Sequence, residues 1–213
     1  ISALTSFASP GDKVLLHSPT YIGFTNSLRN NGFDIVLSPL IQDENGVWRM
    51  DYEDMDKKLR ENNIHAAILC SPHNPCGRVW ERQELEKAME IYRANDCIVI
   101  SDEIWSDILL EGHKHIPTQS VNEDARNRTV ALYAPSKTFN LAGLQVSNII
   151  IANPRLRALF QAECSRNGYS NLNAMGLAAC QAAYESGQEW LEQLKLYLQE
   201  NLKCMKDFLQ TEL

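Results

Sequence analysis

The stretch Ala66-Ala-Ile-Leu-Cys70 is followed directly by Ser71-Pro-His-Asn-Pro-Cys-Gly77. The first five residues form an unbroken apolar run, which is typical of a strand in a sheet that is covered on both faces. Two prolines and a glycine in the next seven residues predict a rigid turn. The sequence therefore predicts a buried strand that presents a polar turn, with Asn74 in it, at its carboxyl end.

Strands and helices alternate outward from this stretch in both directions. Further strands are expected at 14–17, 33–37, 97–100, 129–133 and 146–152, and helices at 20–30, 51–60, 81–95, 154–166, 172–186 and 188–209. Asp51 is expected to cap the helix that begins after it. This alternation predicts βαβ units and a mostly parallel sheet. We therefore expect an α/β fold of three layers, α/β/α, as one domain over residues 1–213.

Length and composition indicate an ordinary globular protein. The chain has 213 residues, of which 44% are hydrophobic and 22% charged, enough for one sizeable core. Its net charge of -7 argues against a nucleic-acid or anionic-membrane partner. No apolar run approaches the roughly 20 residues that span a bilayer, and we expect no secretory leader. The six cysteines are scattered without a C-x-x-C pair, which favours reduced thiols in a cytoplasmic protein.

Polar side chains come directly after several of the predicted strands. Tyr21 ends the turn after the first strand, Asn74 comes after the third, Asp102 after the fourth, and the pair Ser136-Lys137 after the fifth. Ligands in open α/β sheets bind beyond the carboxyl ends of the strands. We therefore expect these residues to meet at one edge of the sheet.

Asp102 and Lys137 are candidates for two roles toward one ligand, an acid that pairs with a cation and an amine that attacks an aldehyde. A carboxylate at the end of a buried strand is costly unless it is paired with a cation or hydrogen-bonded. Asp102 could thus keep a proton on a ring nitrogen, although a metal ligand, a helix cap or a structural ion pair is the simpler interpretation of the residue alone. Partial burial of Lys137 would lower its pKa and make its amine a nucleophile toward an aldehyde. An exposed loop lysine is the plain alternative.

The remaining candidates have equally plain alternatives. Asn74, held in a rigid turn, can donate to a phenolate oxygen, whereas His73 beside it is expected to be a turn residue. Ser136 and Thr138 can offer hydroxyls to a phosphate. Tyr21 can stack on a flat ring, although core packing would explain it when it is taken alone.

Three segments together resemble the aspartate aminotransferase superfamily, which is fold type I of the pyridoxal-phosphate enzymes. Ser71-Pro-His-Asn-Pro-Cys-Gly-Arg78 is similar to the asparagine loop of that family, and Ser101-Asp-Glu-Ile-Trp-Ser-Asp107 to its aspartate segment. Ser136-Lys-Thr-Phe-Asn-Leu-Ala-Gly143 is similar to its lysine segment. The likeness covers essentially the whole chain. The run Ala134–Gln145 is most similar to the MalY/PatB branch of cystathionine β-lyases and cystalysin-like carbon–sulfur lyases.

The resemblance implies pyridoxal 5′-phosphate as the cofactor, with Lys137 forming the Schiff base. It implies that Asp102 contacts the ring nitrogen, Asn74 the ring hydroxyl and Tyr21 the ring face, with Ser136 near the phosphate, and it implies no metal site. The implied activity is that of a carbon–sulfur β-lyase acting on cystathionine or related S-substituted cysteines. An aminotransferase and a cofactor-binding regulatory module without turnover stay open. The resemblance also implies a homodimer with a small amino-acid substrate.

Three positions depart from the aminotransferase pattern. Ala134 stands where that pattern has Ser or Gly, Gln145 replaces an arginine that binds the phosphate, and Trp105 replaces a frequent tyrosine. These changes fit the lyase branch better than an aspartate-type transaminase. The resemblance also places the phosphate-binding helix start upstream of Ile1 and a small domain beyond Leu213, so we expect the chain to be a piece of a longer protein.

Overall fold

A seven-stranded sheet forms the centre of the part of the chain that is described, residues 1–169 and 171–212 of a computed structural model. Leu213, at which the expected domain ends, lies outside the described residues. The spatial order of the strands is β3-β2-β1-β4-β5-β6-β7. Their bounds are Lys13–Ser18 (β1), Asp34–Gln42 (β2), Trp48–Met50 (β3), Ala66–Cys70 (β4), Ile98–Asp102 (β5), Thr129–Tyr133 (β6) and Asn148–Ile151 (β7). The five central strands are parallel, and β3 and β7 run antiparallel at the two edges.

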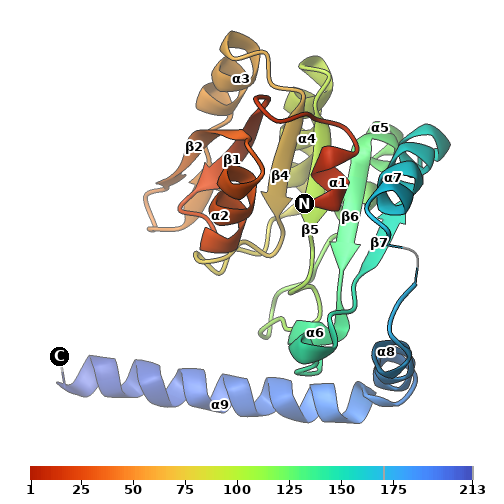
Figure 1. Ribbon diagram of the computed structural model, residues 1–213. Helices are drawn as coiled ribbons and strands as arrows, with labels where there is room; N and C mark the ends of the chain where they lie inside the picture. Colours follow the sequence, from red (N-terminus) through yellow and green to blue (C-terminus); the bar gives the residue numbers. More distant parts are fainter. Residues whose placement is uncertain (170, 213) are drawn as a thin grey trace.

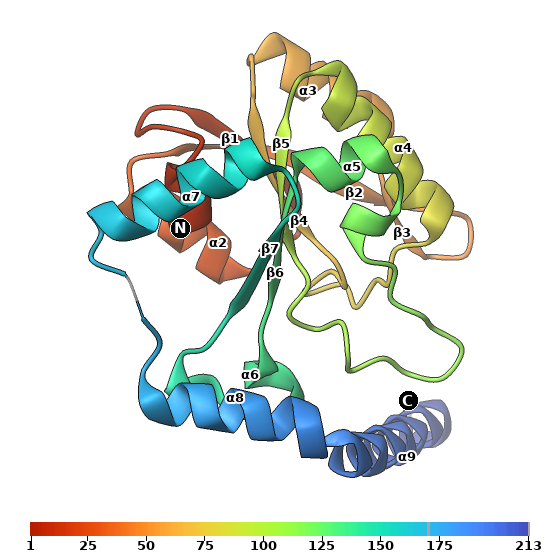
Figure 2. The same cartoon turned by 90° about the vertical axis from the view of Figure 1, so that its right-hand side faces the viewer.

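Helices cover both faces of this sheet, as Figure 2 shows. On one face lie α3 (Tyr52–Glu61), α4 (Arg82–Ala94) and α5 (Glu123–Arg128), and on the other α1 (Ser2–Thr5), α2 (Ile22–Asn30) and α7 (Pro154–Arg166). The short α6 (Pro135–Thr138), α8 (Ala174–Ser186) and the long α9 (Gln188–Glu212) lie beyond the carboxyl ends of the strands (Figure 1). The expected three-layer α/β fold with a mostly parallel sheet is confirmed.

The unbroken apolar run of β4 is explained by its two covered faces. Successive side chains of a strand point to opposite faces. Ala67 and Leu69 accordingly pack in the core under α3 and α4, whereas Ala66 packs in the core under α2 and α7 and Ile68 lies against it. Because both faces are covered, no polar position is needed within the strand.

Apolar periodicity and capping residues in the sequence predicted the long helices and strands correctly but did not predict some of the short ones. Asp51 caps α3 as predicted, because its side chain accepts a hydrogen bond from the backbone N–H of Asp54 at 3.0 Å. The sequence did not predict β3 or α5. β3 has three residues, and α5 has one buried side chain, that of Ala125, so neither shows a periodic apolar pattern.

The strand order determines where a ligand can bind. From β1 the chain moves to β2 on one side and later to β4 on the other, which makes the gap between β1 and β4 a switch point of the kind where α/β proteins bind ligands. No helix in the described residues has the length and hydropathy of a bilayer span.

Candidate active site

The predicted site residues lie at the ends of four neighbouring parallel strands. Tyr21 comes after β1, Asn74 after β4, Asp102 ends β5, and Lys137 lies in α6 after β6. In the sheet these strands stand side by side in the order β1-β4-β5-β6. The topology therefore brings the four segments to one edge of the sheet, which faces α6, α8 and α9 in Figure 1.

The carboxylate of Asp102 lies in an environment that disfavours its charge. Burial raises the pKa of Asp102 to about 6, and the neighbouring charge of Glu103 acts in the same direction. A hydrogen bond of 3.2 Å from the backbone N–H of Ile104 and the charge of Lys137 oppose this shift without cancelling it. A cation placed beside Asp102 would therefore be stabilised, as a protonated ring nitrogen requires.

A cavity of about 350 Å³ links Asp102 to Tyr21. Apolar side chains, among them those of Leu4, Phe24 and Leu132, line the rest of it. Tyr21 is 47% exposed, so core packing does not explain it, although its ring makes an edge-to-face contact with Phe24 at 5.5 Å between centroids. An acid and an aromatic ring at the wall of one apolar cavity fit a flat, cationic heterocycle.

Lys137 is exposed, so the predicted partial burial of its side chain is wrong for this chain. The reason is that α6 lies beyond the sheet and outside the two helical layers (Figure 1). Its Nζ atom lies 5.4 Å from the ring centroid of Trp105, and its charge acts on Asp102. The Lys137 amine is therefore near enough to the Asp102 carboxylate to interact with it electrostatically. One small aldehyde bound between the two groups would require this proximity.

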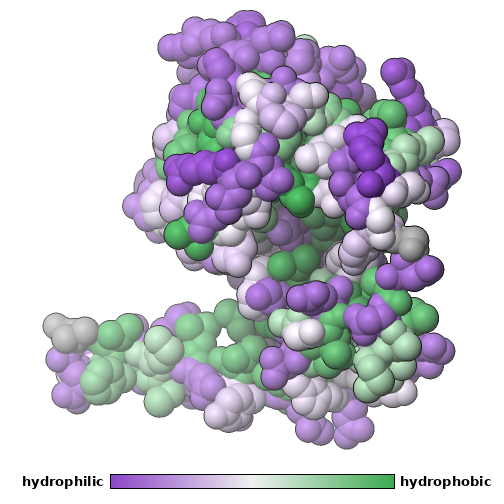
Figure 3. All heavy atoms as spheres, in the orientation of Figure 1, coloured by the Kyte–Doolittle hydropathy of each residue, from purple (hydrophilic) through white to green (hydrophobic). Residues whose placement is uncertain are grey.

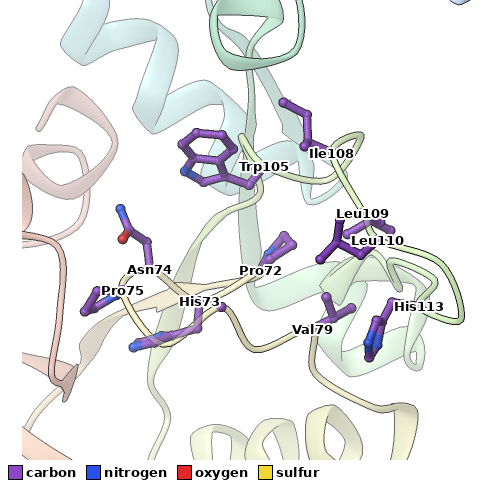
Figure 4. A pocket seen from close by; sticks show the side chains of 11 residues that line it. Pro72, His73, Asn74, Pro75, Val79, Trp105, Ile108, Leu109, Leu110 and His113 are labelled. Atoms are coloured by element: carbon purple, nitrogen blue, oxygen red, sulfur yellow. The ribbon is translucent and has the colours of Figure 1, made fainter. Parts of the chain in front are cut away.

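Asn74 and Trp105 line a second cavity, of about 310 Å³. Figure 4 shows the Asn74 amide and the Trp105 ring on one side of this cavity, with Leu109, Leu110 and other apolar side chains opposite. His73, beside Asn74, is buried and contacts the backbone carbonyl of Pro19 through Nε2 at 2.8 Å. His73 therefore joins the Asn74 turn to the segment before Tyr21, which agrees with its expected role as a turn residue.

Glu103 is the centre of a buried network that sequence reasoning missed. Its side chain is fully buried and meets His115 Nε2 at 2.6 Å and the Tyr133 hydroxyl at 2.5 Å through Oε2. Its Oε1 accepts from the hydroxyl of Ser101 at 2.9 Å and the backbone N–H of Thr118 at 3.1 Å. Burial acts to raise the pKa of Glu103, but the hydrogen bonds from His115, Tyr133 and Ser101 outweigh it and lower that pKa.

The side chains of the adjacent acids Asp102 and Glu103 point to opposite faces of the sheet. Because side chains alternate along a strand, Asp102 lines the cavity on the α2 side while Glu103 shares the side of Ser101. Two neighbouring carboxylates after a buried strand were the available signal for this network. Three partners of Glu103, namely His115, Thr118 and Tyr133, could not be read from the sequence, because they lie 12 to 30 residues away along the chain.

Of the two hydroxyl residues beside Lys137, one is used in a hydrogen bond within the protein and one remains available to a ligand. The hydroxyl of Thr138 donates to Asp107 Oδ2 at 2.8 Å, so Thr138 ties the lysine segment to the aspartate segment and is not free for a phosphate. Ser136 is half-buried beside Lys137. Gln145 is exposed and has a left-handed backbone, with φ 54°. Ser136 is therefore the hydroxyl of α6 that remains as a candidate for a phosphate.

Comparisons with known proteins agree with this arrangement. Residues 1–212 match the family described as aminotransferase class I and II. The chain is 43% identical over 99% of its length to cystathionine beta-lyase PatB of Bacillus subtilis and 32% identical over 96% to protein MalY of Escherichia coli. It covers 54% and 52% of those two proteins, so it spans about half the length of the curated relatives that it matches.

A solved structure shows the same fold. The crystal structure of cystalysin from Treponema denticola, which contains a pyridoxal 5′-phosphate cofactor, superimposes with a TM-score of 0.94 at 34% identity. The match covers 99% of this chain and 53% of cystalysin. The three-layer arrangement around the candidate site is thus shared along almost the whole chain.

Proposed function

This chain belongs to the family of class I and II aminotransferases, and from that premise we propose that the whole protein is a pyridoxal-phosphate-dependent carbon–sulfur β-lyase. Its substrates would be cystathionine or related S-substituted cysteines. One observation carries the proposal: the Lys137 amine lies near Trp105 and interacts electrostatically with Asp102, whose pKa is raised to about 6 mainly by burial. The acid would be stabilised by a cation, and the amine could react with the ligand that carries that cation. Both properties suit this cofactor.

Each part of the cofactor has a proposed holder. Asp102 would keep the proton on the ring nitrogen, Asn74 would donate to the ring hydroxyl oxygen, and Tyr21 would lie against the ring. Ser136 would contribute its hydroxyl to the phosphate, with further groups from the rest of the protein. Lys137 would attach the cofactor covalently. When bound, the cofactor supplies an electron sink for the pair left at the α-carbon of an amino acid.

In the proposed reaction, the amino group of the substrate would first displace Lys137 from its covalent attachment, and the freed Nζ would then take the proton from the α-carbon of the amino acid. The Trp105 ring lies on one side of the amine, with its centroid 5.4 Å from Nζ. The carbon–sulfur bond at the β-carbon then breaks, and the thiolate leaves with a proton as a thiol. Overall, R–S–CH2–CH(NH3+)–COO− and one water give RSH, pyruvate and ammonium.

A lyase is preferred over an aminotransferase on sequence grounds. The 43% identity is to a cystathionine beta-lyase, whereas an aspartate aminotransferase of Sulfurisphaera tokodaii is 26% identical. Ala134, Trp105 and Gln145 also depart from the aminotransferase pattern. The two activities share the proton transfer to Lys137 and diverge at the next step, where a lyase breaks the carbon–sulfur bond.

The test uses the full-length protein with cofactor, supplied with L-cystathionine or S-methyl-L-cysteine. Release of pyruvate without any keto acid is the result expected of a lyase. Turnover only when a keto acid is added would indicate an aminotransferase instead. Cofactor binding without either reaction would favour the regulatory module.

The assembly and compartment are further proposals. We propose a homodimer, as the resemblance implies. Exposed apolar side chains along α8 and α9, such as Met175, Leu177, Leu196 and Phe208, provide surface for such a contact (Figure 3). We also propose a reducing cytoplasm, which the six free cysteines support. Sedimentation of the full-length protein would test the dimer, and a monomer at all concentrations would contradict it.

A further inference from the structure

The cavity between Asn74 and Trp105 continues away from the reacting groups. One of its walls is the Trp105 ring, whose centroid lies 5.4 Å from Lys137 Nζ. Figure 4 shows Leu109, Leu110, Val79 and His113 at the other end. The Trp105 ring therefore contacts the amine that we propose as the base and also lines the cavity, which extends from there to the loop that comes after the aspartate segment.

The wall of this cavity is mostly apolar. Two prolines of the Asn74 turn, Val79 and the aliphatic side chains of the segment 108–110 are six of its eleven lining residues, and its polar residues are Asn74, His73 and His113. Among the described residues that line it there is no Asp, Glu, Lys or Arg, and the nearby carboxylate of Asp107 is hydrogen-bonded to Thr138 instead. A group carrying separate charges would lose hydration there and would find no Asp, Glu, Lys or Arg side chain to pair with.

We propose that this cavity is the subsite for the group on the substrate sulfur, and that it selects an apolar S-alkyl or S-aryl substituent over the charged end of cystathionine. This proposal rests on the proposed lyase function. The sulfur is two bonds from the α-carbon that Lys137 would deprotonate, so its substituent extends past Trp105. The cavity volume of about 310 Å³ leaves room for a butyl or benzyl group.

The expected effect is graded. Each methylene added to the substituent should raise kcat/KM about fourfold, from S-methyl- to S-butyl-L-cysteine, because each buries further apolar surface. Cystathionine should react less efficiently than S-butyl-L-cysteine. β-Chloro-L-alanine, whose leaving group is chloride, has no substituent to place in the cavity and serves as the reference substrate.

The experiment measures pyruvate release by the full-length holoenzyme for these substrates and for two variants at one position. Leu109→Ala should reduce the butyl-to-methyl ratio of kcat/KM at least threefold. Leu109→Arg, which puts a cation in the wall, should raise kcat/KM for cystathionine relative to S-butyl-L-cysteine at least tenfold. Leu159→Ala, at an exposed leucine on α7, is the control and should leave both ratios unchanged.

The outcomes separate the two proposals. No pyruvate from any substrate, β-chloro-L-alanine included, would overturn the lyase function and this subsite with it. Pyruvate from β-chloro-L-alanine, with no dependence on chain length or with both ratios unmoved by the Leu109 variants, would overturn the subsite alone. A rise with chain length together with opposite shifts in the two variants is the result that supports it.

Discussion

The hydroxyl of Thr138 donates a hydrogen bond of 2.8 Å to the carboxylate of Asp107. Thr138 is the residue after Lys137, and Asp107 comes two residues after Trp105, whose ring lies near the Lys137 amine. A second bond, from the Tyr133 hydroxyl to Glu103, joins the same two segments at 2.5 Å. Lys137 is therefore bracketed by two links between the end of β6 and the chain that leaves β5.

Removing the Thr138 hydroxyl should loosen this bracket. Thr138 is fully buried, so Thr138→Val keeps the shape but leaves the Asp107 carboxylate without its donor. We expect the free energy of unfolding to fall by about 1.5–3 kcal/mol, the usual range for a hydrogen bond to a charged group. Urea unfolding of the full-length protein measures it. Thr138→Ser keeps the hydroxyl and should lose much less; equal losses in the two variants would mean that the bond to Asp107 is unimportant.

Glu103→Gln should be among the most damaging substitutions in the chain. It removes the buried carboxylate that is hydrogen-bonded to His115 and Tyr133, and each hydrogen bond to a charged group contributes about 1.5–3 kcal/mol. Because the pKa of Glu103 is lowered from 4.5, its contribution is present above pH 4.5 and is lost as the pH falls through the lower value in the folded protein.

Urea unfolding at several pH values measures the effect of this substitution. The difference between wild type and Glu103→Gln should be constant near neutral pH and shrink in acid. Glu111→Gln, at an exposed glutamate of the loop after β5, is the control and should change the stability by less than about 0.5 kcal/mol. A Glu103→Gln protein as stable as the control would rule out the network as a support.

Asp102→Asn should change the pH dependence of the cofactor-free protein in the opposite sense. The pKa of Asp102 rises from 3.8 to about 6 on folding, so its ionisation costs stability as the pH increases through that window. The substitution removes this cost and should stabilise the cofactor-free protein at pH 7 relative to pH 4, by at most about 3 kcal/mol. Unfolding curves at pH 4, 5, 6 and 7 measure it, and parallel pH profiles for the two proteins would contradict the assignment.

Lys137→Ala should abolish covalent attachment of the cofactor. Reduction of the full-length holoenzyme with borohydride, and then mass spectrometry of its peptides, should locate the cofactor on Lys137 in the wild type and nowhere in the variant. Pyruvate release should fall by at least about 10²–10⁴-fold, the range expected when a general base is removed. Lys57→Ala, on the exposed side of α3, should retain both properties. A label that persists on another lysine in Lys137→Ala would remove Lys137 from this role.

The sequence predicted which strand ends form the candidate site, but not the buried hydrogen bonds that hold those strand ends in place. Tyr21, Asn74, Asp102 and Lys137 could be expected to meet, because the carboxyl ends of parallel strands share one edge of a sheet. The exposure of Lys137 could not be predicted, since it depends on how far α6 lies beyond that edge. The partners of Glu103 were also out of reach. His115 lies in a segment with no periodic pattern, and the sequence marks Tyr133 only as the end of a buried strand.

The alternation of Asp102 and Glu103 has a consequence for changes in chain length. A deletion or insertion of one residue within β5 would turn every later side chain of that strand to the opposite face. The acid facing the cavity would then be directed toward His115, and the acid that belongs with His115 toward the cavity. A substitution in β5 changes one side chain, whereas an insertion or deletion of one residue would direct both carboxylates to the wrong faces of the sheet.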